Sequence, residues 1–222
     1  MNKYLVASIG NWNKDIYKKE TKSINASWFY ASNINEFNKI IKKHKFNFIF
    51  FLHWRWIVPQ SIVKNQNCIC FHMTDLPYGR GGSPLQNLIL RGHKETKLTA
   101  FVMNNKLDAG DILLKRRLSL KGSAHEIYIR TSKLSWKIIK TIIEKKIKKK
   151  KQKGKVEKFK RRAAYQSEMP KNLTISQIYD FIRMLDAPEY PLAHINYGTK
   201  RIYFKNANYL KDKLVFTTYI KK

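Results

Sequence analysis

Hydrophobic and polar residues alternate along the chain in blocks of strand and helix length. Apolar runs at residues 4–9 and 46–52 are typical of strands that are buried on both faces. Between them, residues 33–43 carry apolar side chains at helical spacing. Asn33 and Glu36 have the spacing of a capping box, so this block predicts a helix that begins there.

The same alternation continues to residue 145. Further strand-length runs lie at residues 68–73, 98–103 and 112–120. Pro84 opens a short helix over 84–90, and the pair Ser123 and Glu126 begins a long one. Apolar strands alternating with amphipathic helices predict an α/β domain with a Rossmann-like, mostly parallel sheet over residues 1–145. Ligands of such sheets bind at the carboxyl ends of strands, after Leu52 and after His72.

The C-terminal third has a different pattern. Residues 146–158 contain Lys, Gln and one Gly with few apolar side chains, and we interpret them as a basic linker or the frayed end of a helix. Residues 159–222 then predict a small α+β module. In this module Thr174 and Gln177 cap a helix, a turn at Gly198 joins two strands, and a last strand follows.

Composition places the chain among folded proteins. Of its 222 residues 43% are hydrophobic and 13% aromatic, which excludes a disordered chain. The N-terminus lacks the pattern of a signal peptide. The most apolar stretch, residues 46–59, is interrupted by His53 and Arg55 and is too short to span a bilayer. We therefore expect a cytoplasmic protein without membrane contact.

The two cysteines, Cys68 and Cys70, are two residues apart in a predicted strand. Alternation places both on one face, in a spacing too rigid for an ordinary disulfide. No further ligands stand at the spacing of a metal site. We expect two reduced cysteines and no metal.

The formal net charge is +30, and residues 137–162 alone contribute +12. Such a charge favours anionic ligands: a nucleotide, the glutamate tail of a folate, or RNA. The chain is also rich in Lys, Ile and Asn, and this bias gives the same total without a selected partner. Lys attracts phosphates without reading bases. Charge therefore does not choose among these ligands.

Candidate chemistry gathers in two turns. His72 ends a strand, and a Pro/Gly-rich loop containing Arg80 follows before the next helix starts. Such a loop exposes backbone N–H groups beside the imidazole. Asp108 lies in a second turn, just before a strand. If both turns lie at one edge of the sheet, Asp108 orients His72 and raises its basicity. These residues indicate a base and an acid, but not the reaction.

From Cys70 to Pro84 the sequence resembles, without a gap, the signature of the folate-dependent formyltransferases. The pattern of that family is Asn-x-His, then Ser-Leu-Leu-Pro-x-Tyr-Arg-Gly-x-x-Pro, and later Asp-Ala-Gly before a strand. His72 falls on its catalytic His, and Asp108 on its catalytic Asp within an intact Asp-Ala-Gly. The resemblance continues weakly into the C-terminal module and so covers most of the chain.

Two departures stand inside the motif. Cys70 occupies the place of the family Asn, which holds the formyl oxygen as negative charge develops, and a thiol is a poor donor. A backbone N–H or a water replaces the amide, His72 carries more of the role, or the chain is inactive. In addition, Thr74-Asp75-Leu76-Pro77 replaces Ser-Leu-Leu-Pro, and Gly79 stands where Tyr is common.

The resemblance implies acyl transfer from N10-formyltetrahydrofolate, without a metal. An amine attacks the formyl carbon, His72 binds the oxyanion or takes the amine proton, and Asp108 holds His72. The implied cofactor-binding residues are Trp54, Trp56, Ile57 and Leu107, although the two Trp equally fit a role in closing the core. The implied acceptor-binding residues are Thr74, Tyr78, Arg80 and Gly81, although Arg80 equally fits a salt bridge that braces its loop.

The expected acceptor is a nucleotide-linked amino sugar, such as a UDP-4-amino-4,6-dideoxy sugar of a pseudaminic-acid-type pathway. The C-terminal module is short and the catalytic domain lacks an inserted loop, unlike tRNA-acting members. Two alternatives stay open: a methionyl-tRNA formyltransferase, favoured by the basic charge, and a degenerate folate- or RNA-binding relative, suggested by Cys70. A homodimer is also compatible with the sequence.

Overall fold

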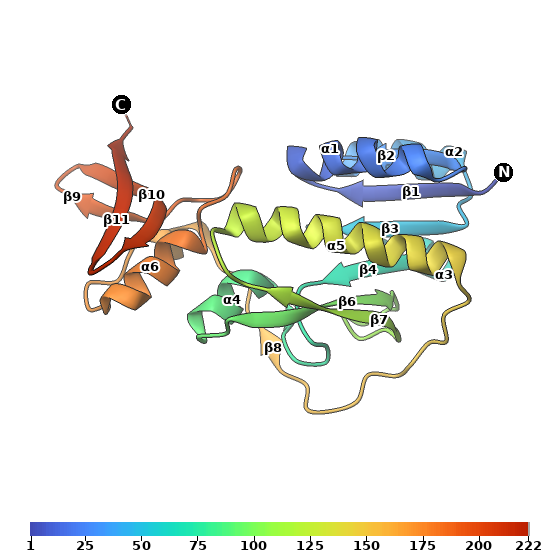
Figure 1. Ribbon diagram of the computed structural model, residues 1–222. Helices are drawn as coiled ribbons and strands as arrows, with labels where there is room; N and C mark the ends of the chain where they lie inside the picture. The colour runs from blue at the N-terminus through green and yellow to red at the C-terminus, as the bar shows by residue number, and fades with distance from the viewer. Residues whose placement is uncertain (222) are drawn as a thin grey trace. The chain divides into compact units, whose positions relative to one another are not determined.

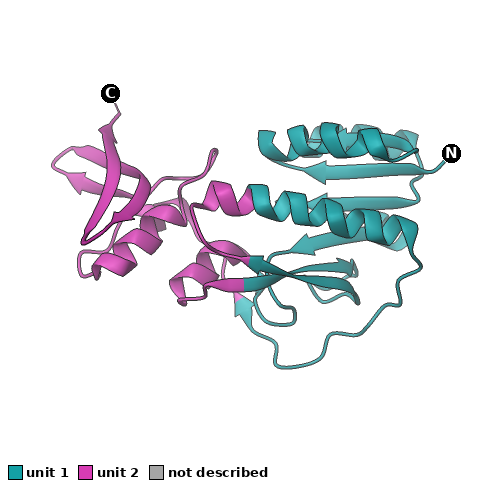
Figure 2. Ribbon diagram, in the orientation of Figure 1, with its two compact units in different colours: residues 1–81, 96–118, 129–158 teal, residues 82–95, 119–128, 159–222 magenta. Residues whose placement is uncertain are grey.

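The computed structural model describes residues 1–221, which form two compact units (Figure 2). Unit 1 contains residues 1–81, 96–118 and 129–158, and unit 2 contains residues 82–95, 119–128 and the chain from 159 onward. Each unit is therefore assembled from three separate stretches of sequence. Among the described residues, no helix is both long and apolar enough to cross a membrane.

The main sheet has six strands in the order β2-β1-β3-β4-β6-β7 (Figure 1). Its first four strands pair in parallel, and β4 pairs with β6 in antiparallel fashion. The strand bounds are β1 Lys3–Ser8, β2 Ser27–Ala31, β3 Phe48–Leu52, β4 Cys68–His72, β6 Glu95–Val102 and β7 Ile112–Ser119. The predicted α/β class with a mostly parallel sheet is confirmed.

Helices bury both faces of this sheet, as the apolar strands require. They are α1 Asn11–Glu20, α2 Ile34–Lys43, α3 Gln60–Asn65 and α5 Ala124–Glu144, and a 3₁₀ turn, Thr21–Ser23, follows α1. On one face, the ring of Trp136 of α5 packs 5.3 Å from the ring of Trp28. On the other, Phe37 of α2 lies 5.6 Å from Phe51 and is fully buried. Both faces of β3 are therefore core.

Unit 2 packs a short sheet with two helices. The helices are α4 Pro84–Leu90 and α6 Ile175–Arg183, and the antiparallel strands are β9 His194–Tyr197, β10 Lys200–Leu210 and β11 Lys213–Ile220. A 3₁₀ turn, Ala164–Ser167, precedes α6. The hydroxyl of Thr174 accepts a hydrogen bond from the backbone N–H of Gln177 at 3.3 Å. The cap and the hairpin predicted for this region are both present.

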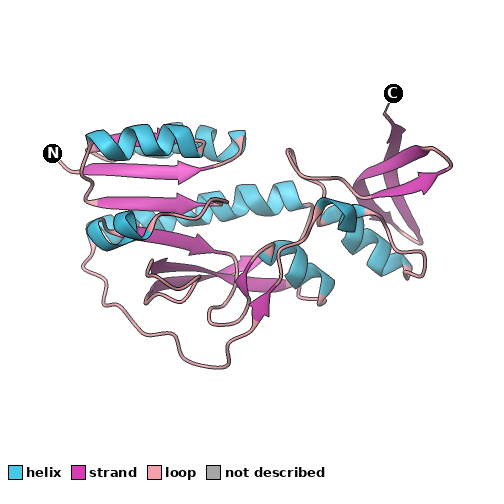
Figure 3. Cartoon of the chain, turned by 180° about the vertical axis from the view of Figure 1, so that it is seen from behind, coloured by secondary structure: helices cyan, strands magenta, loops and turns pink. Residues whose placement is uncertain are grey.

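The stretch between α5 and the short strand β8 (Lys158–Phe159) is an extended loop (Figure 3). β8 pairs with β5 (Arg80–Gly81). Lys150 and Ile112 exchange two backbone hydrogen bonds of 2.7 and 2.9 Å. This basic stretch is therefore attached to unit 1 at more than one point. Helix α5 itself ends at Glu144 without continuing into it.

Candidate active site

Strand β4 ends at His72, and the turn before β7 carries Asp108. Nδ1 of His72 lies 3.8 Å from Oδ2 of Asp108, and their side chains are 9% and 11% exposed. The two turns therefore meet at one edge of the sheet. This is the arrangement in which the sequence predicts that Asp108 lies beside His72. Both side chains are therefore largely buried, and a small part of each is exposed to solvent.

Hydrogen bonding fixes which ring nitrogen of His72 carries the proton. Nε2 lies 2.7 Å from the carbonyl oxygen of Gly79, which can only accept, so Nε2 carries a proton and donates it. Nδ1 then faces the Asp108 carboxylate at 3.8 Å. In the neutral ring Nδ1 holds the lone pair, so the site presents a proton acceptor with a negative charge beside it.

Asp108 is held by its own backbone and by its neighbours. Its φ of 50° lies in the left-handed region, which Asp tolerates better than most residues. Oδ2 accepts a hydrogen bond of 2.9 Å from the backbone N–H of Gly81. Gly81, predicted to contact the acceptor, therefore binds the proposed catalytic carboxylate.

Arg80 braces this part of the site through a residue that the sequence did not reveal. Its Nε and Nη2 donate to Oε1 of Gln152 at 3.1 and 2.7 Å. Nε2 of Gln152 donates in turn to the carbonyl oxygens of Asp108 and Gly110, at 2.8 and 2.9 Å. Arg80 thus braces its loop through an amide and not through the carboxylate of a salt bridge, and its contact with the acceptor stays a prediction. A Gln among lysines gives no sequence signal for such a role.

Cys70 is partly buried on β4, and its pKa differs from that of an ordinary thiol. Burial, and next the charge of Asp108, raises the pKa of Cys70 well above its usual value. Burial likewise raises the pKa of Cys68 to about 12. Both cysteines are free. Cys70 thus stays a protonated thiol, which is a weak hydrogen-bond donor at the position of the family Asn.

Thr74 and Tyr78 lie in the loop after β4. Thr74 is fully buried. Its hydroxyl donates to the carbonyl oxygen of Gly79 at 3.4 Å, and its own carbonyl accepts from the hydroxyl of Thr99 at 2.6 Å. Tyr78 is half-buried. Thr74 therefore builds the loop from inside, and Tyr78 is the more accessible of these two predicted acceptor contacts.

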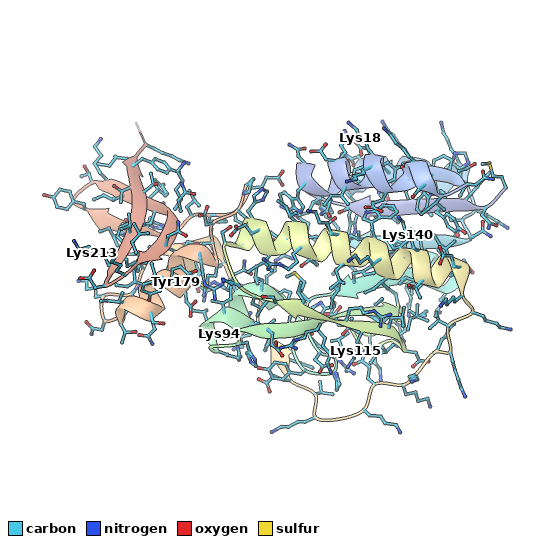
Figure 4. The ribbon with its side chains drawn as sticks, in the orientation of Figure 1. Lys18, Lys94, Lys115, Lys140, Tyr179 and Lys213 are labelled. Atoms are coloured by element: carbon cyan, nitrogen blue, oxygen red, sulfur yellow. The ribbon has the colours of Figure 1, made fainter. Side chains whose placement is uncertain are left out.

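A cluster of charged residues anchors the same loop at Asp75, which stands where the family has Leu. Lys115 of β7, which is labelled in Figure 4, donates to Asp75 and to the carbonyl of Leu76. Lys97 lies 2.9 Å from Asp75. Burial opposes ionisation of Asp75, but hydrogen bonds and charge from Lys115 and Lys97 outweigh it, so its pKa lies below the ordinary value. The ion pairs of Asp75 with Lys115 and Lys97 therefore help to hold the loop after β4 in place.

The four residues predicted to bind the folate differ in exposure. The Trp54 ring packs 5.6 Å from Phe37 and 4.6 Å from Trp56, so Trp54 closes the core on the α2 side. Ile57 is 91% exposed and Leu107 is 73% exposed. Nε1 of Trp54 is buried without a hydrogen-bond partner. Trp54 and Trp56 are themselves only partly buried, and exposed apolar side chains and aromatic rings are of the kind that suits a flat heterocycle.

Two family models match the chain. The model described as "Formyl transferase" matches residues 16–143, and the model described as "Methionyl-tRNA formyltransferase, C-terminal domain" matches residues 164–221. The methionyl-tRNA formyltransferase of Rickettsia prowazekii (strain Madrid E) is 38% identical over 84 residues, which are 37% of this chain and 28% of the relative. The chain thus spans less than a third of the length of this curated relative.

Solved structures extend the similarity to the whole chain. A methionyl-tRNA formyltransferase from Clostridium thermocellum is 39% identical, with a TM-score of 0.95 and complete coverage of both chains. A 4-N formyltransferase from Francisella tularensis is 18% identical, with a TM-score of 0.70 and coverage of 100% of this chain and 98% of that one. HypX from Aquifex aeolicus with tetrahydrofolic acid is 14% identical, with a TM-score of 0.76 and coverage of 92% of this chain and 37% of that one. The last two likenesses show the fold alone.

Proposed function

Because this chain belongs to the formyl transferase family, we propose that it transfers the formyl group of N10-formyltetrahydrofolate to an amine. The observation that carries the proposal is the meeting of His72 and Asp108 at 3.8 Å. These are the residues on which the family motif places its His and Asp, and they are more than 30 positions apart in sequence. A structural His at the end of a strand needs no such carboxylate.

The geometry supports a proton transfer at Nδ1 of His72. The lone pair of the acceptor amine attacks the formyl carbon, the C=O pair moves to oxygen, and the amine proton passes to Nδ1. Asp108, 3.8 Å away, stabilises the imidazolium that forms. On collapse, the oxyanion re-forms the C=O bond, the C–N bond to the carrier breaks, and the carrier nitrogen takes the proton from Nδ1 of His72. His72 therefore acts first as base and then as acid.

The folate is a co-substrate, and Ile57, Leu107 and Trp56 support its binding. Ile57 and Leu107 are exposed and apolar, and the ring of Trp56 packs against Trp54 in the loop after β3, tilted by 59°. Such side chains suit the flat faces of a pterin, which gains from apolar contact. The complex of HypX with tetrahydrofolic acid, on the same fold, is consistent with this use.

Methionyl-tRNA is the first candidate for the acceptor. A structure of that name is 39% identical over the whole chain, and the C-terminal family model carries the same name over residues 164–221. That structure has the same length as this chain, so a short C-terminal module is no argument against a tRNA acceptor. The net charge of +30 favours a polyanion.

A nucleotide-linked amino sugar is the second candidate. The Francisella tularensis 4-N formyltransferase shares the fold over 98% of its length. Chain size does not separate the two acceptors, because the Clostridium thermocellum structure is also matched over its full length. A UDP-4-amino-4,6-dideoxy sugar has the primary amine and the diphosphate that the reaction and the basic surface call for. A homodimer, which is compatible with the sequence, stays a prediction as well.

One assay tests the function and separates the two acceptors. The purified protein is incubated with N10-formyltetrahydrofolate and either methionyl-tRNA or a UDP-4-amino-4,6-dideoxy sugar, and the formylated product is followed by mass spectrometry. We expect one acceptor to be formylated, and His72→Ala to lower kcat by about 100-fold or more. His44→Ala, at the C-cap of α2, is the matched control and should retain activity. Full activity in His72→Ala would refute the assignment.

Cys70→Asn in the same assay addresses the degenerate alternative. An amide donates a stronger hydrogen bond to a developing oxyanion than a thiol does, so we expect kcat to rise. If the wild-type protein and Cys70→Asn both bind folate without transfer to either acceptor, the chain is a binding protein and the proposed reaction is wrong.

A further inference from the structure

Gln152 joins the two loops that carry the proposed catalytic machinery. The loop after β4 supplies Arg80, and the turn before β7 supplies Asp108 and Gly110. The side-chain amide of Gln152 bonds to all three of these residues, at 2.7 to 3.1 Å. Gln152 is part of neither loop and is more than 40 positions away from Asp108 in sequence.

The orientation of this amide is dictated by its partners. A guanidinium can only donate and a carbonyl can only accept, so Oε1 faces Arg80 and the NH₂ group faces Asp108 and Gly110. An amide has two N–H donors and an oxygen with two lone pairs. Here both donors and both lone pairs are used, each in one hydrogen bond. Among the natural side chains that fit this space, Gln alone provides this set.

The backbone around Gln152 is anchored on both sides. Lys150 exchanges two hydrogen bonds with Ile112 of β7, and the carbonyl oxygen of Glu157 accepts from the backbone N–H of Arg80 at 2.9 Å. The Gln152 side chain is therefore attached to a segment that is fixed to the sheet and to the loop. A side chain on such a segment can transmit constraint to the turn that it binds.

We propose that Gln152 is a positioning residue, which holds the Asp108 turn so that its carboxylate stays opposite His72. The NH₂ group binds the carbonyls on both sides of Ala109, which fixes the shape of the turn. Asp108 adopts a left-handed φ of 50° there, a conformation that needs support. The inference rests on the proposed function, since it assigns Gln152 a part in the same reaction.

Two substitutions distinguish the hydrogen bonds of the Gln152 NH₂ group from those of its Oε1. Gln152→Met keeps the length and shape of the side chain but removes all four hydrogen bonds. Gln152→Glu still accepts from Arg80, yet sets a carboxylate against the carbonyls of Asp108 and Gly110. If the turn is what matters, both variants lose activity. Lys151→Ala, on the exposed neighbouring residue of the same segment, is the matched control.

Steady-state kinetics are measured for these variants with the acceptor that the wild-type protein uses. We expect both Gln152 variants to lower kcat by about 10- to 100-fold, since small displacements of a catalytic group have effects of this size. The KM values for folate and acceptor should stay within about threefold, and Lys151→Ala should match the wild type. Unchanged kcat per folded molecule, or a rise in KM alone, would overturn the proposal.

A second measurement does not depend on activity. The backbone N–H of Gly81 donates to Asp108 Oδ2, so its hydrogen exchange, followed by NMR, reports whether the carboxylate stays in place. We expect exchange at Gly81 to be at least about tenfold faster in Gln152→Met than in the wild type. Unchanged exchange at Gly81 would refute the positioning role. A wild-type protein without transfer activity, but with this change in exchange, would refute only the proposed reaction.

Discussion

Two histidines follow neighbouring strands of the sheet, and their surroundings differ. His72 ends β4 opposite a carboxylate, whereas His53 follows β3 and lies edge-on to the ring of Trp12, 6.0 Å away. Burial, and next the charge of Arg55, lowers the pKa of His53 to about 4. The fold therefore disfavours the protonated form of His53.

The lowered pKa of His53 predicts how the free energy of unfolding depends on pH. Between pH 6.5 and about 4 the unfolded chain binds a proton at His53 that the folded chain does not, so stability falls as the pH falls through this window. The pKa shift corresponds to at most about 3 kcal/mol. His53→Asn tolerates the φ of 53° and removes the titrating group. Urea unfolding at pH 7 and pH 4.5 should show a smaller loss for the variant, and equal losses would contradict the prediction.

At the residue scale, sequence reasoning named the proposed reacting groups but not the residues that hold them. The Asn-x-His and Asp-Ala-Gly patterns led to His72 and Asp108, because the motif itself carries their roles. Gln152 was missed, since its role depends on a fold that brings three loops together. The burial of Thr74 and the packing of Trp54 in the core depend in the same way on neighbours that are remote in sequence.

At the scale of elements, the turn before β7 depends on Gly110. A Cβ at this position would lie 1.7 Å from the carbonyl oxygen of Val102 and 3.3 Å from the ring of Phe101. Both atoms belong to β6, so the turn lies directly against that strand. A side chain larger than hydrogen would push the turn, and Asp108 with it, away from the sheet.

We therefore expect Gly110→Ala to cost more than about 2 kcal/mol of unfolding free energy, because backbone must move to relieve the clash. Transfer activity per folded molecule should also fall. Gly198→Ala is the control: its φ is 55°, but a Cβ there meets open space, so it should cost about 1 kcal/mol and leave the activity per folded molecule unchanged. Chemical denaturation and the transfer assay measure both effects, and equal behaviour of the two variants would refute the argument.

Elements were predicted best where their signals are local. Capping residues located the starts of α2 and α6, where Asn33 and Thr174 accept the expected hydrogen bonds. Helix α1 was missed because its N-cap, Gly10, makes no side-chain cap and its sequence is mostly polar. The antiparallel pairing of β4 with β6 was not visible either, since strand direction is set by the path of the connection.

At the scale of the whole molecule, unit 2 depends on stretches that are far apart in sequence. Arg183 of α6 is buried and donates to the carbonyls of Leu120 and Gly122, at 2.6 and 2.9 Å. Gln86 of α4 donates to the carbonyl of Met184 at 3.0 Å. A buried guanidinium without these acceptors would be costly. The C-terminal part of unit 2 therefore needs residues 82–95 and 119–128 for these buried hydrogen bonds.

A fragment of residues 159–222 should for this reason not fold on its own, although the C-terminal family model covers almost all of it. We expect no cooperative thermal transition in circular dichroism and little dispersion of amide signals in NMR. The full chain measured under the same conditions is the control. A fragment that melts cooperatively would show that unit 2 does not require residues 82–95 and 119–128.

The sequence alone determined the α/β class, most of the elements and the identity of the proposed base and acid, because hydrophobic periodicity, caps and a catalytic motif are all local patterns. Tertiary structure decided how Asp108 is held: by the backbone of Gly81, by the amide of Gln152 and by close contact of Gly110 with β6. These contacts join residues that are distant along the chain. Their energies depend on distances and directions that exist only once the sheet has formed.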